Sequence, residues 1–108
     1  MILENSGLQL NLFPDQLLEV ERLAGLAWGL SRIARYLGIP INVIENEFNK
    51  PDSELRHHYM RGLDISQAKI DMALQKLAEG GNLTASAIMN KKLRETKYQI
   101  RKNKILYG

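Results

Sequence analysis

Asparagine, arginine and lysine side chains recur between residues 32 and 50 at spacings that suit contact with a nucleic acid. Asn42 and Asn46 are four residues apart, so on a helix both would lie on one face. An asparagine amide can bond N7 and N6 of adenine in a major groove, whereas arginine and lysine hold phosphates and fix the position of the protein. We therefore take Asn42 and Asn46 as candidate base contacts, and Arg32, Arg35 and Lys50 as candidate phosphate contacts.

Two carboxylates oppose this interpretation. Glu45 and Glu47 are expected to flank the outward strip, where each would meet phosphates unfavourably and could at best accept a hydrogen bond from cytosine N4. The sequence thus leaves open whether this segment recognises bases at all. The alternative for Arg32 and Arg35 is an ordinary solvated surface.

The basic character of the chain lies near its C-terminus. The net charge is +3, yet residues 91–104 hold seven basic residues against Glu95 alone, and the remainder of the chain is net acidic. On a helix, Lys91, Arg94, Lys97 and Arg101 would share one side, where we expect contact with DNA or an acidic protein. The alternative is favourable placement of cations toward a helix C-terminus.

Catalytic and metal-binding chemistry has no support in the sequence. Cysteine is absent, no glycine-rich phosphate loop with its lysine is present, and no serine or acid sits in a recognisable nucleophile motif. Glu54 and His57 echo the Glu-x-x-His spacing of helical metal sites but lack the further carboxylates that such sites need. We expect no enzyme activity, no cofactor and no bound metal.

The hydrophobic share of 44% and the charged share of 25% are those of an ordinary soluble protein, without an apolar run long enough to cross a bilayer. We expect a cytoplasmic protein.

The pattern over residues 30–49 predicts two short helices joined by a glycine turn. Ala34 is small enough for a close helix crossing, Gly38 can adopt the left-handed conformation, and Ile39 and Ile44 are expected to point inward. This is the spacing of a helix-turn-helix, which favours DNA binding. The alternative is a helical corner with a purely structural role.

Prolines and capping residues predict where these helices end. A supporting helix should begin at Pro14 and stop at Gly29. Ser31 is expected to cap the next helix, and Pro40 to occupy the first position of a third, which should end by Asn49.

Two long helices are predicted after residue 51, forming an antiparallel hairpin with a Gly-Gly-Asn corner. The first should tolerate Gly62 and extend about 39 Å, which is longer than a small domain is wide. The expected capping residues are Asp52 or Ser53 for the first helix and Asn82 or Thr84 for the second.

Apolar residues recur at intervals of three and four along both long helices, presenting more apolar surface than one chain can hide. We expect copies to pack together through it; the alternative is a monomeric two-helix arm. The residues expected to join copies are Tyr59, Leu63, Ile70, Leu74, Leu77, Met89 and Leu93.

The predicted fold is therefore all-α, a helix-turn-helix head followed by the long hairpin. Residues 1–13 would form an N-terminal arm, residues 14–50 a DNA-binding domain, and residues 51–108 an oligomerisation region with a basic C-terminal tail.

This order of parts resembles the small subunit of the bacteriophage terminase, the DNA-packaging complex of tailed phages and prophages. The resemblance covers about Leu17 to Leu93. It is carried by IARYLGIPINVIENEF, the Asn49-Lys50-Pro51-Asp52 connection, RGLDISQAKIDMALQKLAEGGN and LTASAIMNKKL.

The resemblance implies a non-catalytic subunit that binds double-stranded viral DNA in a bacterial host and assembles into a homo-oligomeric ring through its hairpin. It also implies delivery of that DNA to a separate terminase large subunit carrying the ATPase and nuclease. The chain departs from the family in two ways: members often have a longer C-terminal segment that contacts the large subunit, and the third helix here is poorer in basic residues than a DNA-reading helix usually is.

Two other functions fit the same sequence. A helix-turn-helix transcriptional regulator would be a dimer with half-sites about one helical turn apart. A phage scaffold or adaptor would bind protein only, which the two glutamates favour.

Overall fold

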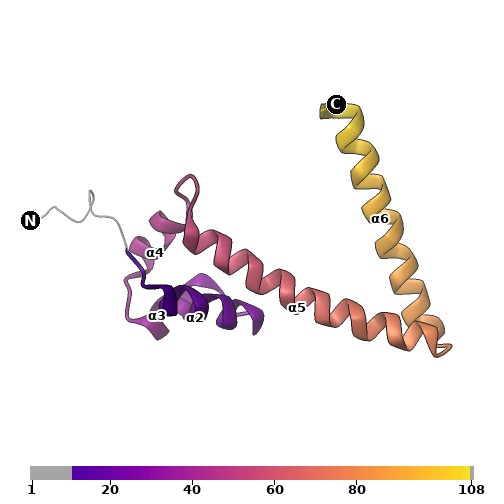
Figure 1. Ribbon diagram of the computed structural model, residues 1–108, viewed down its shortest axis with the longest axis horizontal. Coiled ribbons are helices and arrows are strands. Elements are labelled where there is room, and N and C mark those ends of the chain that lie inside the picture. The colour runs from indigo at the N-terminus through magenta and orange to yellow at the C-terminus, as the bar shows by residue number, and fades with distance from the viewer. Residues whose placement is uncertain (1–10, 108) are drawn as a thin grey trace, which may run out of the picture. The chain divides into compact units, whose positions relative to one another are not determined.

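The computed structural model describes residues 11–107, with side chains through residue 104, and every regular element in this range is an α-helix (Figure 1). The all-α prediction is confirmed. Most of the expected N-terminal arm, residues 1–10, lies outside the described residues. The helices are α2 (Pro14–Gly25), α3 (Leu30–Leu37), α4 (Ile41–Phe48), α5 (Glu54–Glu79) and α6 (Leu83–Tyr107).

The chain divides into two compact units, Met1–Ser66 and Gln67–Gly108, so α5 contributes its first half to one and its second half to the other. We call them unit 1 and unit 2. Among the described helices, none combines the length and apolar character needed to span a membrane.

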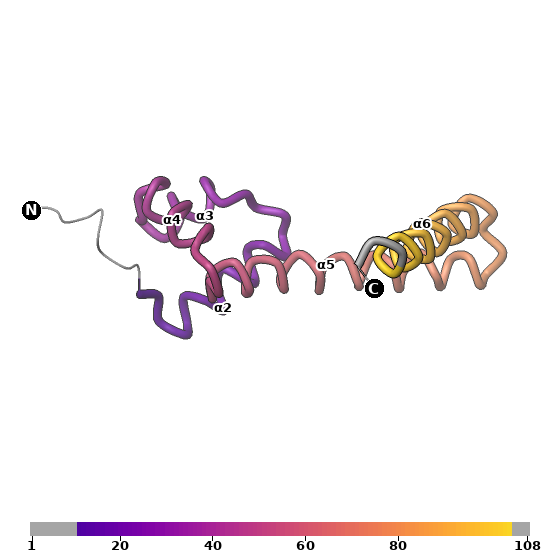
Figure 2. The backbone as a smooth tube through the Cα atoms, turned by 90° about the horizontal axis from the view of Figure 1, so that it is seen from above, coloured from indigo at the N-terminus to yellow at the C-terminus, as the bar shows by residue number. Residues whose placement is uncertain are grey.

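Unit 1 has a small, well-buried core to which all of its helices contribute. Figure 2 shows α2, α3 and α4 gathered around the start of α5. Partly buried apolar side chains, including Trp28, Phe48 and Tyr59, surround this core. The core residues are Val20 and Leu23 of α2, Ile33 and Ala34 of α3, Ile44 of α4 and Leu55 of α5.

Helix α2 begins as predicted but ends earlier. Pro14 occupies its first turn, and the Phe13 backbone N–H donates to Gln16 Oε1 at 2.9 Å. The predicted stop at Gly29 is wrong, because the helix ends at Gly25 and Ala27 adopts a left-handed φ of 66°. Gly29 is instead the N-cap of α3, so the expected cap at Ser31 is wrong too.

The turn between α3 and α4 follows the prediction closely. Gly38 has a left-handed φ of 74°, and the Ile39 backbone N–H donates to Ala34 O at 2.9 Å. Ala34 and Ile44 are buried and Ile39 packs against the core, as expected. Pro40 precedes α4 as its N-cap, one position earlier than predicted, and α4 ends at Phe48.

The start of α5 is fixed against α2 by a close helix crossing. Ser53 Oγ accepts a hydrogen bond from the Arg56 backbone N–H at 3.0 Å, so the cap predicted at Asp52 or Ser53 is Ser53. A Cβ on Gly62 would lie 2.1 Å from Glu21 O and 2.9 Å from Ala24 Cβ. Gly62 is therefore required by the crossing, and the prediction that it is merely tolerated is wrong.

Unit 2 consists of the second half of α5 and α6, joined by a short corner. Gly81 has a φ of 95°, and Asn82 Oδ1 accepts from the Ala85 backbone N–H at 2.9 Å, so Asn82 and not Thr84 caps α6. Lys92 Nζ lies 3.0 Å from Asp71 Oδ1, linking the two helices. Ala85 alone is fully buried among the described residues of this unit, whose larger apolar side chains remain partly or mostly exposed.

Candidate nucleic-acid interface

Helix α3 and the connection before it carry a cluster of basic and aromatic side chains, which we call the α3 cluster: Trp28, Arg32, Arg35 and Tyr36. The Arg32 guanidinium carbon lies 3.8 Å from the centroid of the Trp28 ring, over its face. The rings of Trp28 and Tyr36 meet edge to face, with centroids 5.6 Å apart. Arg32, Arg35 and Tyr36 are exposed, while Trp28 packs partly into the core.

A surface network on α2 supports the Tyr36 end of this cluster. The Tyr36 hydroxyl donates to Glu19 Oε2 at 3.2 Å, and the Arg22 guanidinium donates to both oxygens of Glu19 at 2.7 and 2.8 Å. The Arg22 hydrogen bond holds the pKa of Glu19 below its ordinary value. Glu19 thus neutralises Arg22 and fixes the Tyr36 ring beside Trp28.

The other cations of unit 1 are already engaged. Lys50 Nζ lies 3.0 Å from Glu47 Oε1, and Arg61 Nε lies 3.4 Å from Glu21 Oε1. Arg56 donates to the carbonyl oxygens of Phe48 and Lys50, at 2.9 and 3.1 Å, which secures the end of α4.

The side chains of Arg32 and Arg35, by contrast, have no hydrogen bond or ion pair with any other described residue of the chain. Of the three predicted phosphate contacts, these two have no acidic partner among the described residues, whereas Lys50 forms an ion pair with Glu47.

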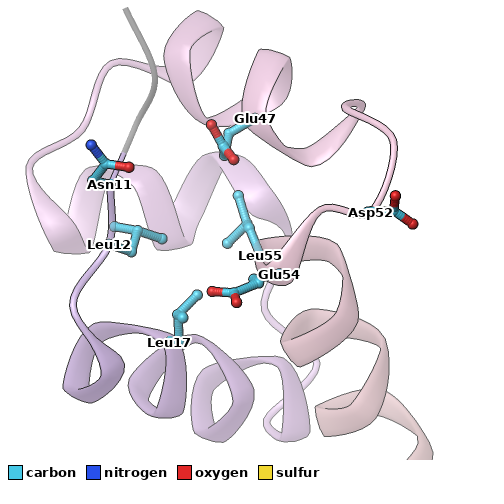
Figure 3. Close-up of a pocket in the computed structure, with 7 residues that line it drawn as sticks. All are labelled: Asn11, Leu12, Leu17, Glu47, Asp52, Glu54 and Leu55. Atoms are coloured by element: carbon cyan, nitrogen blue, oxygen red, sulfur yellow. The ribbon is translucent and has the colours of Figure 1, made fainter.

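The polar strip predicted on α4 is exposed, but one of the two acids expected to flank it is not. Asn42, Glu45 and Asn46 are exposed, as expected. Glu47 was expected to flank this strip, but it is partly buried, and Figure 3 shows it directed toward Leu55. One acid, Glu45, therefore remains beside the two asparagines.

A small acidic pocket of about 180 Å³ lies between α4, the N-terminal part of α2 and the start of α5. Figure 3 shows Glu47, Glu54 and three leucines converging on it, with Asp52 at its edge directed away. Carboxylates would repel a phosphate here. The described residues include no group of three acids or histidines able to hold a metal ion. The pocket lining is Asn11, Leu12, Leu17, Glu47, Asp52, Glu54 and Leu55.

The two histidines face different surroundings, as their adjacency on a helix predicts. His58 Nδ1 lies 3.0 Å from Glu21 Oε1, so this side chain helps to join α5 to α2. His57 is exposed.

Helix α6 carries the second predicted basic surface, in unit 2. Lys91, Arg94, Lys97 and Arg101 are all exposed. Lys92 is instead held by Asp71, whose pKa is lowered first by a hydrogen bond from Gln67 and then by Lys92.

Tyr98 is also exposed, and by helical position it falls between Lys91 and Arg94. The basic side of α6 therefore includes an aromatic ring.

The residues expected to join copies fall into three groups. Tyr59 belongs to unit 1, where its hydroxyl donates to Trp28 O at 2.9 Å and its ring packs edge to face on Phe48. Ile70, Leu77 and Leu93 are each more than half exposed. The partly buried members are Leu63, Leu74 and Met89.

Trp28 and Tyr36 were not predicted from the sequence as part of a site. The available signal is their spacing, since Trp28, Arg32 and Tyr36 follow one another at intervals of four residues. The stacked arginine could not be inferred from spacing alone, because Trp28 lies in the connection before α3 and not on the helix.

Comparison of the chain with known protein families, characterised proteins and solved structures finds no match in any of the three.

Proposed function

We propose that this chain is a non-catalytic DNA-binding assembly protein of the terminase small subunit type. In this proposal α3, the Gly38 turn and α4 act as a helix-turn-helix on duplex DNA. Unit 2 folds as a helical hairpin and joins copies into a ring. The observation that carries the proposal is that two features occur in one chain. Unit 1 has exposed arginines without an acidic partner among the described residues, and unit 2 has exposed apolar side chains.

The DNA-binding part of the proposal is supported by the charge distribution on unit 1. Arg32 and Arg35 lie three residues apart on one helix, exposed and without an acidic partner among the described residues. Asn42 and Asn46 are exposed on the helix that follows the turn. Arginine positions a protein on phosphates, and asparagine can bond adenine.

The assembly part is supported by the exposure of apolar side chains on unit 2. Ile70, Leu77, Leu93 and Ile100 are 52%, 54%, 54% and 62% exposed. Covering such side chains contributes about 25 cal/mol per Å² of apolar surface removed from water, which favours association of copies. In a ring, the basic side of α6 would repeat in every copy and form a positive band suited to DNA.

A phage scaffold or adaptor that binds only protein is the second candidate. It is favoured by Glu45 on the outward strip of α4 and by the acidic pocket that Glu47 and Glu54 line. A dimeric transcriptional regulator would use unit 1 in the same way as the main proposal and would differ in the number of copies.

Mass in solution and duplex binding together separate these functions. Light scattering after gel filtration should give eight or more copies for the ring, whereas a dimer would favour the regulator. An oligomer that ignores duplex DNA at low salt would favour the scaffold or adaptor. A terminase subunit should also retain the large subunit during copurification.

A further inference from the structure

We infer that the α3 cluster is the phosphate-binding surface of unit 1, with Trp28 acting as a positioning residue for Arg32. This inference rests on the proposed DNA binding and deepens it. It assigns the contact to the first helix of the helix-turn-helix and to the phosphate backbone of duplex DNA.

The basic side chains of α3 are free to bind a phosphate, whereas the basic residue that follows α4 is not. Lys50, the basic residue that follows α4, is bound to Glu47, while Arg32 and Arg35 have neither an acidic nor a carbonyl partner among the described residues. A phosphate approaching α3 therefore displaces no existing ion pair. A phosphate approaching the end of α4 must compete with Glu47.

The Trp28 ring restricts the conformations of the Arg32 side chain. A free arginine loses about 2 kcal/mol of rotamer freedom when it is fixed. Stacking at 3.8 Å over Trp28 restricts Arg32 before any ligand arrives. Tyr36, anchored by Glu19, contacts the Trp28 ring and helps to hold it in place.

The same geometry favours phosphates over unpaired bases. Single-strand binding proteins use free aromatic faces on which bases stack. Here one face of Trp28 is occupied by Arg32, the ring packs partly into the core, and its remaining surroundings include Tyr36. The cluster thus offers two exposed guanidinium groups, and one face of its Trp28 ring is already occupied. Duplex DNA should bind at least as well as a single strand of equal length.

Trp28 supplies the test, because it is the only tryptophan in the chain and lies in the proposed site. Addition of a random-sequence DNA duplex to the full-length protein should change the Trp28 emission with the same midpoint as the fluorescence anisotropy of a labelled duplex. Arg32→Ala and Arg35→Ala should each weaken duplex binding roughly tenfold. Each should also lower the slope of log affinity against log salt by about 1.

Three control variants separate this role from a general effect of charge or folding. Arg61→Ala removes the same charge from a residue that pairs with Glu21 and lies outside the α3 cluster, and it should leave the salt slope unchanged. Arg32→Lys keeps the charge but loses the planar stack, so the slope should stay and the affinity should fall. Trp28→Phe keeps an aromatic face and should preserve most of the binding, with circular dichroism checking the fold.

The outcomes distinguish failure of the assignment to α3 from failure of the proposed DNA binding. Duplex binding with an unchanged Trp28 emission, and with Arg32→Ala and Arg35→Ala behaving like Arg61→Ala, would overturn the assignment to α3 while leaving DNA binding intact. A tenfold preference for single-stranded DNA would also overturn it. Absence of any duplex binding at low salt would remove the proposed function together with this inference.

Discussion

Units 1 and 2 are both helical, yet they differ in how far they bury their apolar side chains. In unit 1, Val20, Ile33 and Ile44 are fully buried by four short or partial helices. In unit 2, Ile70, Leu77 and Leu93 remain more than half exposed on two long helices. The difference separates a unit that folds around its own core from one that leaves apolar surface exposed, and such surface favours association.

The two units also differ in the polar contacts that join their helices. Unit 1 uses side chains to fix one helix against another: Arg56 bonds the end of α4, and His58 and Arg61 meet Glu21 of α2. Among the described side chains of unit 2, the polar contact that joins α5 to α6 is the ion pair of Lys92 with Asp71. Unit 1 should therefore be the more rigid of the two.

The largest expected effect comes from closing the space at the crossing of α2 and α5. Gly62→Ala places a Cβ 2.1 Å from Glu21 O, and should destabilise unit 1 by at least about 3 kcal/mol. Urea unfolding followed by Trp28 emission, which reports on unit 1 alone, measures the change. Gly25→Ala is the matched control, because its Cβ would meet Gly62 O at an ordinary 3.5 Å. Equal stability of the two variants would refute the close crossing.

A matched pair of isoleucines tests the contrast in burial directly. Ile44→Ala removes a fully buried side chain and should cost about 3 kcal/mol in the same urea experiment. Ile70→Ala removes a side chain that is 52% exposed and should leave the unfolding of unit 1 unchanged. If Ile70→Ala destabilised unit 1 as strongly as Ile44→Ala, the division into two units would be wrong.

The glycine turn between α3 and α4 should show an intermediate effect. Gly38→Ala must adopt a φ of 74°, which costs roughly 1 kcal/mol for a residue with a Cβ. Gly29→Ala is the comparison, since Gly29 has a φ of −76° and nothing within 4 Å of its added Cβ. Thermal unfolding should show a clearly lower midpoint for Gly38→Ala than for Gly29→Ala.

Acid should produce the smallest effect, and in both units. The pKa of Glu19 is lowered by the Arg22 hydrogen bond, and that of Asp71 by Gln67 and Lys92. A pKa lower in the folded than in the unfolded chain stabilises the fold above the unfolded value, near pH 4, and this contribution disappears as the pH falls through the folded value.

Substitutions with neutral side chains test this pH dependence. Glu19→Gln and Asp71→Asn should unfold at slightly lower temperatures than the wild type at pH 7 and at the same temperature at pH 2. A difference that persists at pH 2 would point to packing instead of charge.

Elements of the fold that depend on local chemistry were predictable from the sequence. Gly38, Ser53 and Asn82 act as the turn and capping residues that their types and positions suggest. The end of α2 was not predictable, because Ala27, an ordinary helix former, takes a left-handed conformation there. The role of Gly62 also escaped prediction, since it depends on the approach of a helix distant in sequence.

The candidate site was predictable only in part. Exposure of Arg32, Arg35, Asn42 and Asn46 follows from helical periodicity. The engagement of Lys50 depends on where Glu47 lies, and the stacking of Arg32 depends on the path of the chain between α2 and α3. Such tertiary contacts select which of several similar basic residues remain available, and no spacing rule encodes them.

Sedimentation velocity over a hundredfold range of concentration tests most directly whether unit 2 joins copies. We predict one species of eight or more chains for the wild type. Replacing Leu77, Leu93 and Ile100 with lysine should yield monomers whose Trp28 unfolding is unchanged. A wild-type chain that sediments as a 12.3 kDa monomer at every concentration would contradict the account.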